Sequence, residues 1–229
     1  MVDQMPYQPE HPVQPPNSGQ PTGNPIRAAL AAYVSLHSLG TPAAELLTLA
    51  ASGGLTRPVA VALAEQLAQH ERQALKAELL DALLFAIATA LSDARLTREE
   101  ISELQQLRRT MGIHEGDLYR HRRARLGAIL DAEMRRLLAD RKIDPTEALH
   151  QVDLQEVFDL SYDEYLELTK PVADRIVNEL IESIATDGVV TSEEREQLDS
   201  QLRALDSVYK LNSVQRQRLQ KAGLNLPVG

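Results

Sequence analysis

The chain has 229 residues, of which 43% are hydrophobic, and carries 24 basic against 33 acidic side chains, a net charge of −9. It contains no cysteine, which excludes disulfide scaffolds, cysteine-ligated zinc, iron–sulfur clusters and thiol nucleophiles. Only 3% of its residues are aromatic, so alanine and leucine must supply most of the packing, a composition that favours helices. The longest apolar stretch, 79–91, contains Asp81 and is shorter than the ~20 residues that span a membrane. With no signal-peptide pattern at the N-terminus, we expect a soluble, cytoplasmic protein.

Residues 1–25 hold seven of the twelve prolines and few apolar side chains, so we expect a disordered tail. Helical periodicity fills almost all the rest, with no alternating strand pattern, and the predicted fold class is all-α. We expect N-terminal helices over 26–75 and a helical repeat domain over 76–229. The predicted helices cover 26–37, 43–51, 56–75, 76–91, 97–111, 115–139, 144–158, 161–185, 191–208 and 213–222.

An internal repeat organises the second region. Asp93, Asp140 and Asp187 are spaced 47 residues apart without a gap, and apolar positions on both sides keep the same register. An aliphatic residue stands three positions after each Asp, a helix-capping residue stands four positions after it, and a glutamate stands seven positions after it. The capping residues are Thr97, Asp144 and Thr191, and the glutamates are Glu100, Glu147 and Glu194. We therefore predict stacked helical hairpins with repeats of about 47 residues, forming a bundle or a short superhelical array, with a degenerate fourth copy within 26–75.

The acidic turns have two interpretations. Thr97 with Glu100, and Thr191 with Glu194, match the capping box that satisfies the first amides of a helix, and Asp144 before Pro145 is a cap of another kind. Alternatively, the turns supply carboxylate oxygens for Ca²⁺. The candidate ligands are Asp93, Glu99 and Glu100 in the first turn and Asp187, Glu193 and Glu194 in the third. No other cofactor is expected.

Residues 185–194 (ATDGVVTSEE), set within a helical hairpin, resemble the signature of the TerB-like (tellurite-resistance B) family. Residues 91–100 (LSDARLTREE) resemble it too, with Ala94 where that family prefers glycine. The resemblance implies a small helical bundle linked to stress responses and membrane-associated complexes, with divalent metal bound at such turns. The run from Ala90 to about Leu168 is also similar to helical repeats of the chloroplast inner-envelope import scaffold.

Residues 108–142 form a basic block of ten Arg or Lys against five Asp or Glu. Its candidate anion-binding side chains are Arg120, Arg122, Arg123, Arg125, Arg135 and Arg136. At 100° per residue these arginines spread round a helix, and Arg122 shares a face with Leu118 and Leu126. The partner of this block stays open. The alternatives are acidic segments of the same chain, an anionic membrane surface, an acidic protein partner and nucleic acid.

No zinc-protease, phosphate-loop, dinucleotide-binding or nucleophile-elbow motif occurs, and we expect no enzymatic activity and no catalytic residue. The favoured function is a non-enzymatic helical adaptor that mediates protein–protein interaction. Its expected partner is another protein or a second copy of the same chain. A Ca²⁺-binding stress protein and a nucleic-acid-associated protein are the alternatives.

Overall fold

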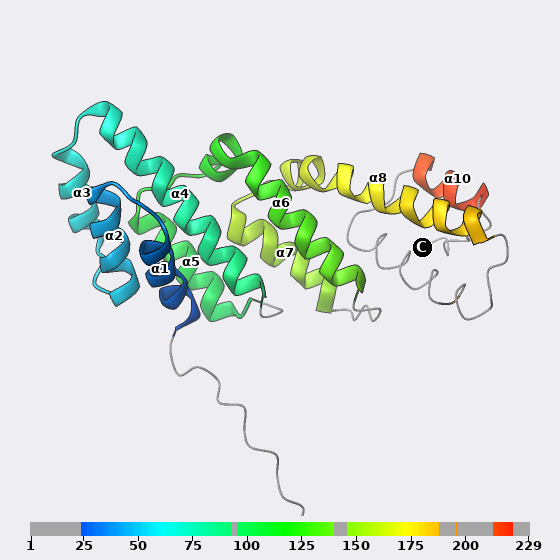
Figure 1. Cartoon of the computed structure of the whole chain (residues 1–229), viewed down its shortest axis with the longest axis horizontal. Helices are drawn as coiled ribbons and strands as arrows, with labels where there is room; N and C mark the ends of the chain where they lie inside the picture. Colours follow the sequence, from blue (N-terminus) through cyan, green and yellow to red (C-terminus); the bar gives the residue numbers. More distant parts are fainter. Residues whose placement is uncertain (1–23, 93–95, 140–145, 188–195, 197–212, 222–229) are drawn as a thin grey trace, which may run out of the picture.

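The computed structural model describes residues 24–92, 96–139, 146–187, 196 and 213–221 (Figure 1). All secondary structure within these residues is α-helical, so the predicted all-α fold class is confirmed. The helices are α1 (Pro25–Leu36), α2 (Thr41–Ser52), α3 (Arg57–Glu65), α4 (Gln69–Ser92), α5 (Arg98–Thr110), α6 (Asp117–Ala139), α7 (Thr146–Phe158), α8 (Tyr162–Asp187) and α10 (Ser213–Lys221). None of these described helices is long and apolar enough to cross a membrane.

The helices stack into an elongated array, with α1, α2 and α3 at one end and α8 and α10 at the other (Figure 1). α1 and α2 pack on α4, which also contacts α5 and α6. Further along the array, α5 contacts α7, and α6 contacts α8, against which α10 lies. The described helices thus form an array of stacked hairpins rather than a closed bundle.

α4 lies at the centre of the hydrophobic core. Its side chains Leu80, Leu83, Leu84 and Ile87 are at most 1% exposed, as expected for a helix that is apolar on most faces. A single cluster of buried side chains extends from α1 to α8. The predicted division between an N-terminal region and a repeat domain at residues 75 and 76 therefore falls inside a continuous helix, and both regions share one core.

The predicted tail, 1–25, overlaps the start of α1. Asn24 is the N-cap of α1, because its side-chain oxygen accepts a hydrogen bond from the Arg27 amide at 3.0 Å. Pro25 occupies the first turn, where a missing amide hydrogen costs nothing. The Asn24 side-chain amide also donates to Glu103 of α5. Residues 1–23 lie outside the described residues, and their disorder stays a prediction.

The structure corrects one pair of helix boundaries. The helices expected over 56–75 and 76–91 are instead α3, which ends at Glu65, and α4, which begins at Gln69. At the break between them, the Ala68 amide donates to the carboxylate of Glu71 at 2.7 Å. The first turn of α4 is thus capped by an acid inside the helix, and the usual signal of a capping residue before the helix is absent.

The capping interpretation of the first acidic turn is confirmed. The Glu100 amide donates to the Thr97 hydroxyl at 3.2 Å, and the Thr97 amide donates to the Glu100 carboxylate at 2.7 Å. This is the reciprocal capping box that the spacing predicts. Asp144 and Thr191, the capping residues of the other two turns, lie outside the described residues.

Several described features recur at the predicted spacing of 47 residues. Gly112 and Asp159 both have a left-handed backbone, with φ of 71° and 57°, within two residues of the end of a helix. Two residues further on, the His114 amide donates to Asp117 and the Ser161 amide donates to Glu164, both at 2.8 Å. The bounds of α4 and α5 likewise match those of α6 and α7 after the same shift, within about a residue. These recurrences support the repeat for its first two copies, and most of the third lies outside the described residues.

Candidate functional site

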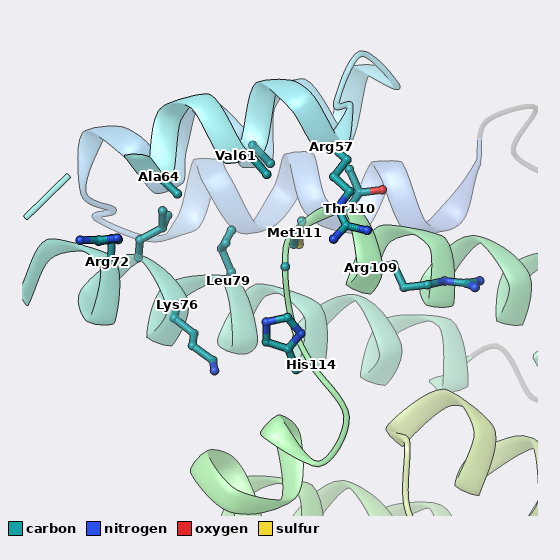
Figure 2. A pocket seen from close by; sticks show the side chains of 13 residues that line it. Arg57, Val61, Ala64, Arg72, Lys76, Leu79, Arg109, Thr110, Met111 and His114 are labelled. Atoms are coloured by element: carbon teal, nitrogen blue, oxygen red, sulfur yellow. The ribbon is translucent and has the colours of Figure 1, made fainter. Parts of the chain in front are cut away.

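A pocket of about 300 Å³ lies between α3, α4 and the segment that follows α5 (Figure 2). Its walls are mostly apolar and its rim is basic. The apolar wall consists of Ala60, Val61, Ala64, Leu75, Leu79 and Met111. The cationic rim consists of Arg57, Arg72, Lys76 and Arg109, and His114 also lines the pocket. Among the described residues, none with an acidic side chain lines this pocket.

Two helix faces form the long sides of the pocket. α3 contributes Arg57, Ala60, Val61 and Ala64, and α4 contributes residues with the same i, i+3, i+4, i+7 spacing. That spacing places all four side chains of a helix on one face, over two turns. The pocket is therefore a groove between two helix faces, and the segment after α5 closes its floor through Met111, which is 7% exposed.

α3 buries little of its apolar surface, and its exposed side chains adjoin the groove. Within α3 only Ala60 is buried, whereas Val59 and Val61 are 39% and 45% exposed. Leu79, in α4 opposite, is 3% exposed and lies deep in the groove. Apolar surface thus continues from the interior of the groove onto the outside of α3.

Among the described residues, the arginines of the cationic rim have no carboxylate partner. Within the part of the chain that the structure describes, Arg57, Arg72 and Arg109 form no ion pair, although Arg109 donates to the Gln105 carbonyl at 3.3 Å. All three side chains are exposed. Lys76 differs, because its ammonium lies 2.8 Å from the buried carboxylate of Asp117. The rim therefore carries exposed positive charge beside an apolar wall.

Asp117 links this rim to the start of α6. It accepts hydrogen bonds from the His114 amide and pairs with Lys76 and Arg120. Burial alone would raise the pKa of Asp117, but the Lys76 ammonium, the His114 amide and the Arg120 guanidinium outweigh it, and the pKa lies below the ordinary value of 3.8. The carboxylate stays ionised and fixes Lys76 at the rim.

The arginines predicted from sequence as an anion-binding cluster lie elsewhere and are paired within the chain. Arg122 binds both carboxylate oxygens of Asp81 in α4, at 2.8 and 3.1 Å, and donates to the Ala77 carbonyl at 2.9 Å. Its backbone, with φ −135° and ψ 25°, breaks the helical geometry of α6 at this point. Arg125 reaches the same carboxylate at 2.8 Å. Internal pairing, one of the alternatives open from the sequence, therefore holds for these two arginines.

The other four arginines of that cluster also have acidic partners. Arg120 lies 3.2 Å from Asp117, and the Arg136 Nε donates to Glu133 at 3.1 Å. Arg135 lies 3.5 Å from Asp131 and 3.8 Å from Glu179.

Arg123 pairs with Glu167, which also accepts the Tyr119 hydroxyl. The hydrogen bond from the Tyr119 hydroxyl, and then that from Arg123, lowers the pKa of Glu167. The predicted anion-binding residues thus spread over several ion pairs, and the structure does not gather them into one site.

The predicted Ca²⁺ ligands are only partly described. Glu99 and Glu100 lie in the first turn of α5, where the Glu100 carboxylate serves the Thr97 cap. Asp187 is the last residue of α8, two residues beyond the predicted end of that helix. Asp93, Glu193 and Glu194 lie outside the described residues. Within the described residues no group of three or more His, Asp or Glu side chains is placed to hold a metal ion, and Ca²⁺ binding stays a prediction.

A second, polar hollow of about 830 Å³ lies between α5, α7 and the start of α8. Arg108 faces Asp159 there at 2.9 Å, and the Asp159 carboxylate also accepts from the Gly116 amide at 3.0 Å. The positive charge that lines this hollow is paired, so it offers no site comparable to the groove.

Reasoning from sequence missed the groove. Arg57, Arg72 and Arg109 are far apart along the chain, and only Arg109 lies within the predicted basic block. A local signal existed in α3, where Arg57, Ala60, Val61 and Ala64 form a helix face with few large apolar side chains.

No family model, no curated protein and no solved structure matches the chain, and the resemblance to TerB-like proteins rests on the two quoted segments alone.

Proposed function

We propose that the chain is a non-enzymatic helical adaptor that binds a partner protein at the groove between α3 and α4. The observation that carries the proposal is the position of Arg57, Arg72 and Arg109, exposed arginines without carboxylate partners in the described residues, around an apolar wall. Protein interfaces have a similar composition, with an apolar centre, a polar rim and more arginine than the rest of the surface.

The residues of the groove are suited to binding rather than to chemistry. His114 and Thr110 line it, but general acid–base or nucleophilic catalysis needs a second group within hydrogen-bond reach to activate or orient the first. The His114 amide is engaged by Asp117, and no acidic side chain among the described lining residues faces its ring. The exposed part of Val61 extends the apolar surface beyond the pocket, which suits a partner larger than a small molecule.

The test compares two exposed valines of similar accessibility. Val61, in the groove, is 45% exposed and Val152, on α7 away from the groove, is 52% exposed. Wild type, Val61→Asp and Val152→Asp are immobilised, and proteins retained from the native cytoplasm are quantified by mass spectrometry. We expect partners retained by the wild type and by Val152→Asp to be depleted from Val61→Asp by about tenfold, the effect of a buried charge of roughly 1.4 kcal/mol or more.

Circular dichroism must show that both variants melt like the wild type, since both substitutions are at exposed positions. Equal retention by Val61→Asp and the wild type would contradict the proposal. Loss of the same partners from Val152→Asp would place the interface elsewhere on the array.

A further inference from the structure

We infer that the groove receives an α-helical segment of the partner that carries acidic residues at i and i+7 and aliphatic residues at i+3 and i+4. This inference rests on the proposed function, because it specifies the chemistry of the segment that the adaptor would bind. The juxtaposition that carries it is a pair of basic poles, one at each end of an apolar groove two helical turns long.

The two poles lie at opposite ends of the groove. Figure 2 shows Arg57 and Arg109 at one end and Arg72 and Lys76 at the other, with the apolar side chains of Val61, Leu79 and Met111 between them. Arg57 is the first residue of α3, and Arg72 is in the first turn of α4. Because the two helices run in opposite directions along the groove, the arginine that begins each lining face stands at a different end (Figure 2).

The length of the groove matches two turns of an α-helix. Arg57 and Ala64 mark the ends of the lining face of α3, and seven residues at 1.5 Å each separate them by about 10 Å. Carboxylates at i and i+7 of a bound helix have the same separation and lie on the same face, with i+3 and i+4 between them. In an extended strand, residues on one face are about 6.6 or 13 Å apart, and neither spacing matches.

The two separated basic poles favour a segment with two separated acidic residues over a ligand with a single anionic group. A fatty carboxylate has a single anionic head, which would neutralise one pole and leave the arginines of the other unpaired. A single-stranded nucleic acid would need stacking partners for its bases, and none of the described side chains that line the groove is Phe, Tyr or Trp. An aliphatic side chain at i+3 or i+4 fits the wall formed by Val61, Leu79 and Met111.

The experiment uses two labelled peptides of equal composition and about 15 residues, long enough to be helical in an alanine-rich host. The two-ended peptide has Glu at i and i+7 and Leu at i+3 and i+4, and the one-ended peptide has both glutamates before the first leucine. Binding to the full chain is followed by fluorescence anisotropy at low salt. We expect the two-ended peptide to bind more tightly, and Arg57→Gln and Arg72→Gln each to weaken it by about two- to fivefold, as for exposed ion pairs.

Arg123→Gln is the matched control, because Arg123 is an exposed arginine outside the groove that already pairs with Glu167. It should leave the binding of the two-ended peptide unchanged. The one-ended peptide should respond to only one of Arg57→Gln and Arg72→Gln. Val61→Asp should abolish binding of both peptides, which places them in the groove.

Three results would overturn the inference. The first is equal affinity for the two peptides, or unchanged binding of the two-ended peptide to both Arg57→Gln and Arg72→Gln. The second is displacement of the two-ended peptide by dodecanoate at a lower concentration than by unlabelled peptide. The third is self-association of the chain in sedimentation that Val61→Asp abolishes, which would make a second copy the occupant. If the peptides fail while partner retention still depends on Val61, the adaptor function stands and only the acidic-helix ligand is wrong.

Discussion

Replacement of Arg122 by glutamine should destabilise the chain by about 2 kcal/mol. The substitution removes two charge-assisted hydrogen bonds to Asp81, at 2.8 and 3.1 Å, and one to the Ala77 carbonyl at 2.9 Å. The side chains of Arg122 and Asp81 are 23% and 27% exposed, so solvent screens the pair only in part. One hydrogen bond to a charged group contributes about 1.5–3 kcal/mol. We take the value of about one such bond for all three, because solvent screens the partly exposed pair and Arg125 still partners Asp81.

Arg125→Gln is the matched control, because Arg125 lies on the same helix and contacts the same carboxylate. Its side chain is 44% exposed and makes one contact to Asp81, at 2.8 Å, so its loss should cost less than about 1 kcal/mol. Urea unfolding of wild type and both variants gives the free energies, provided that the slope with denaturant stays constant. Equal effects of the two substitutions, or a cost below about 0.5 kcal/mol for Arg122→Gln, would refute the assignment of Arg122 as the residue that ties α6 to α4.

Other expectations concern the caps, the rim and the acidic turns. Thr97→Ala should cost about 1 kcal/mol in urea unfolding through loss of the α5 cap, and no measurable cost would show that the capping box is dispensable. Asp117 has a pKa below 3.8 in the folded chain, so its contribution to stability is complete above that value and is lost as the pH falls below it. In Asp117→Asn, stability should therefore fall less steeply between pH 5 and about pH 2 than in wild type, and identical pH profiles would contradict this. Millimolar Ca²⁺ should leave the melting temperature unchanged, whereas a rise of several degrees that Asp187→Asn abolishes would establish the metal site.

The helices and the first cap were predictable because the interactions that define them are local. Periodicity places Leu83 and Ile87 in the core, and the spacing of Thr97 and Glu100 is sufficient for the capping box. The boundary between α3 and α4 was not predictable in the same way. Ala68 is not a capping residue and gives no signal of a helix start. Glu71 does the capping instead, and it is one of many glutamates in the chain.

Long-range pairing explains two charged residues whose apolar surroundings are puzzling in the sequence alone. Asp81 interrupts the longest apolar stretch, and Arg122 shares a helical face with Leu118 and Leu126. Each looks unfavourable alone, and the structure shows that they bind each other across 41 residues of chain. The groove is a further case, because the sequence does not indicate that Arg57 and Arg72 would frame one apolar wall from two antiparallel helices.

The sparse packing of α3 has a consequence for how occupancy of the groove would be detected. A helix that buries only Ala60 and has nine residues separates from the array at a much smaller free-energy cost than global unfolding. Its backbone amides should therefore exchange with deuterium far faster than those of α4, whose side chains fill the core. A ligand between α3 and α4 binds only the closed arrangement, so it suppresses that local opening in proportion to its concentration and affinity. Amide protection in α3 thus becomes an internal gauge of groove occupancy that needs no label on the partner.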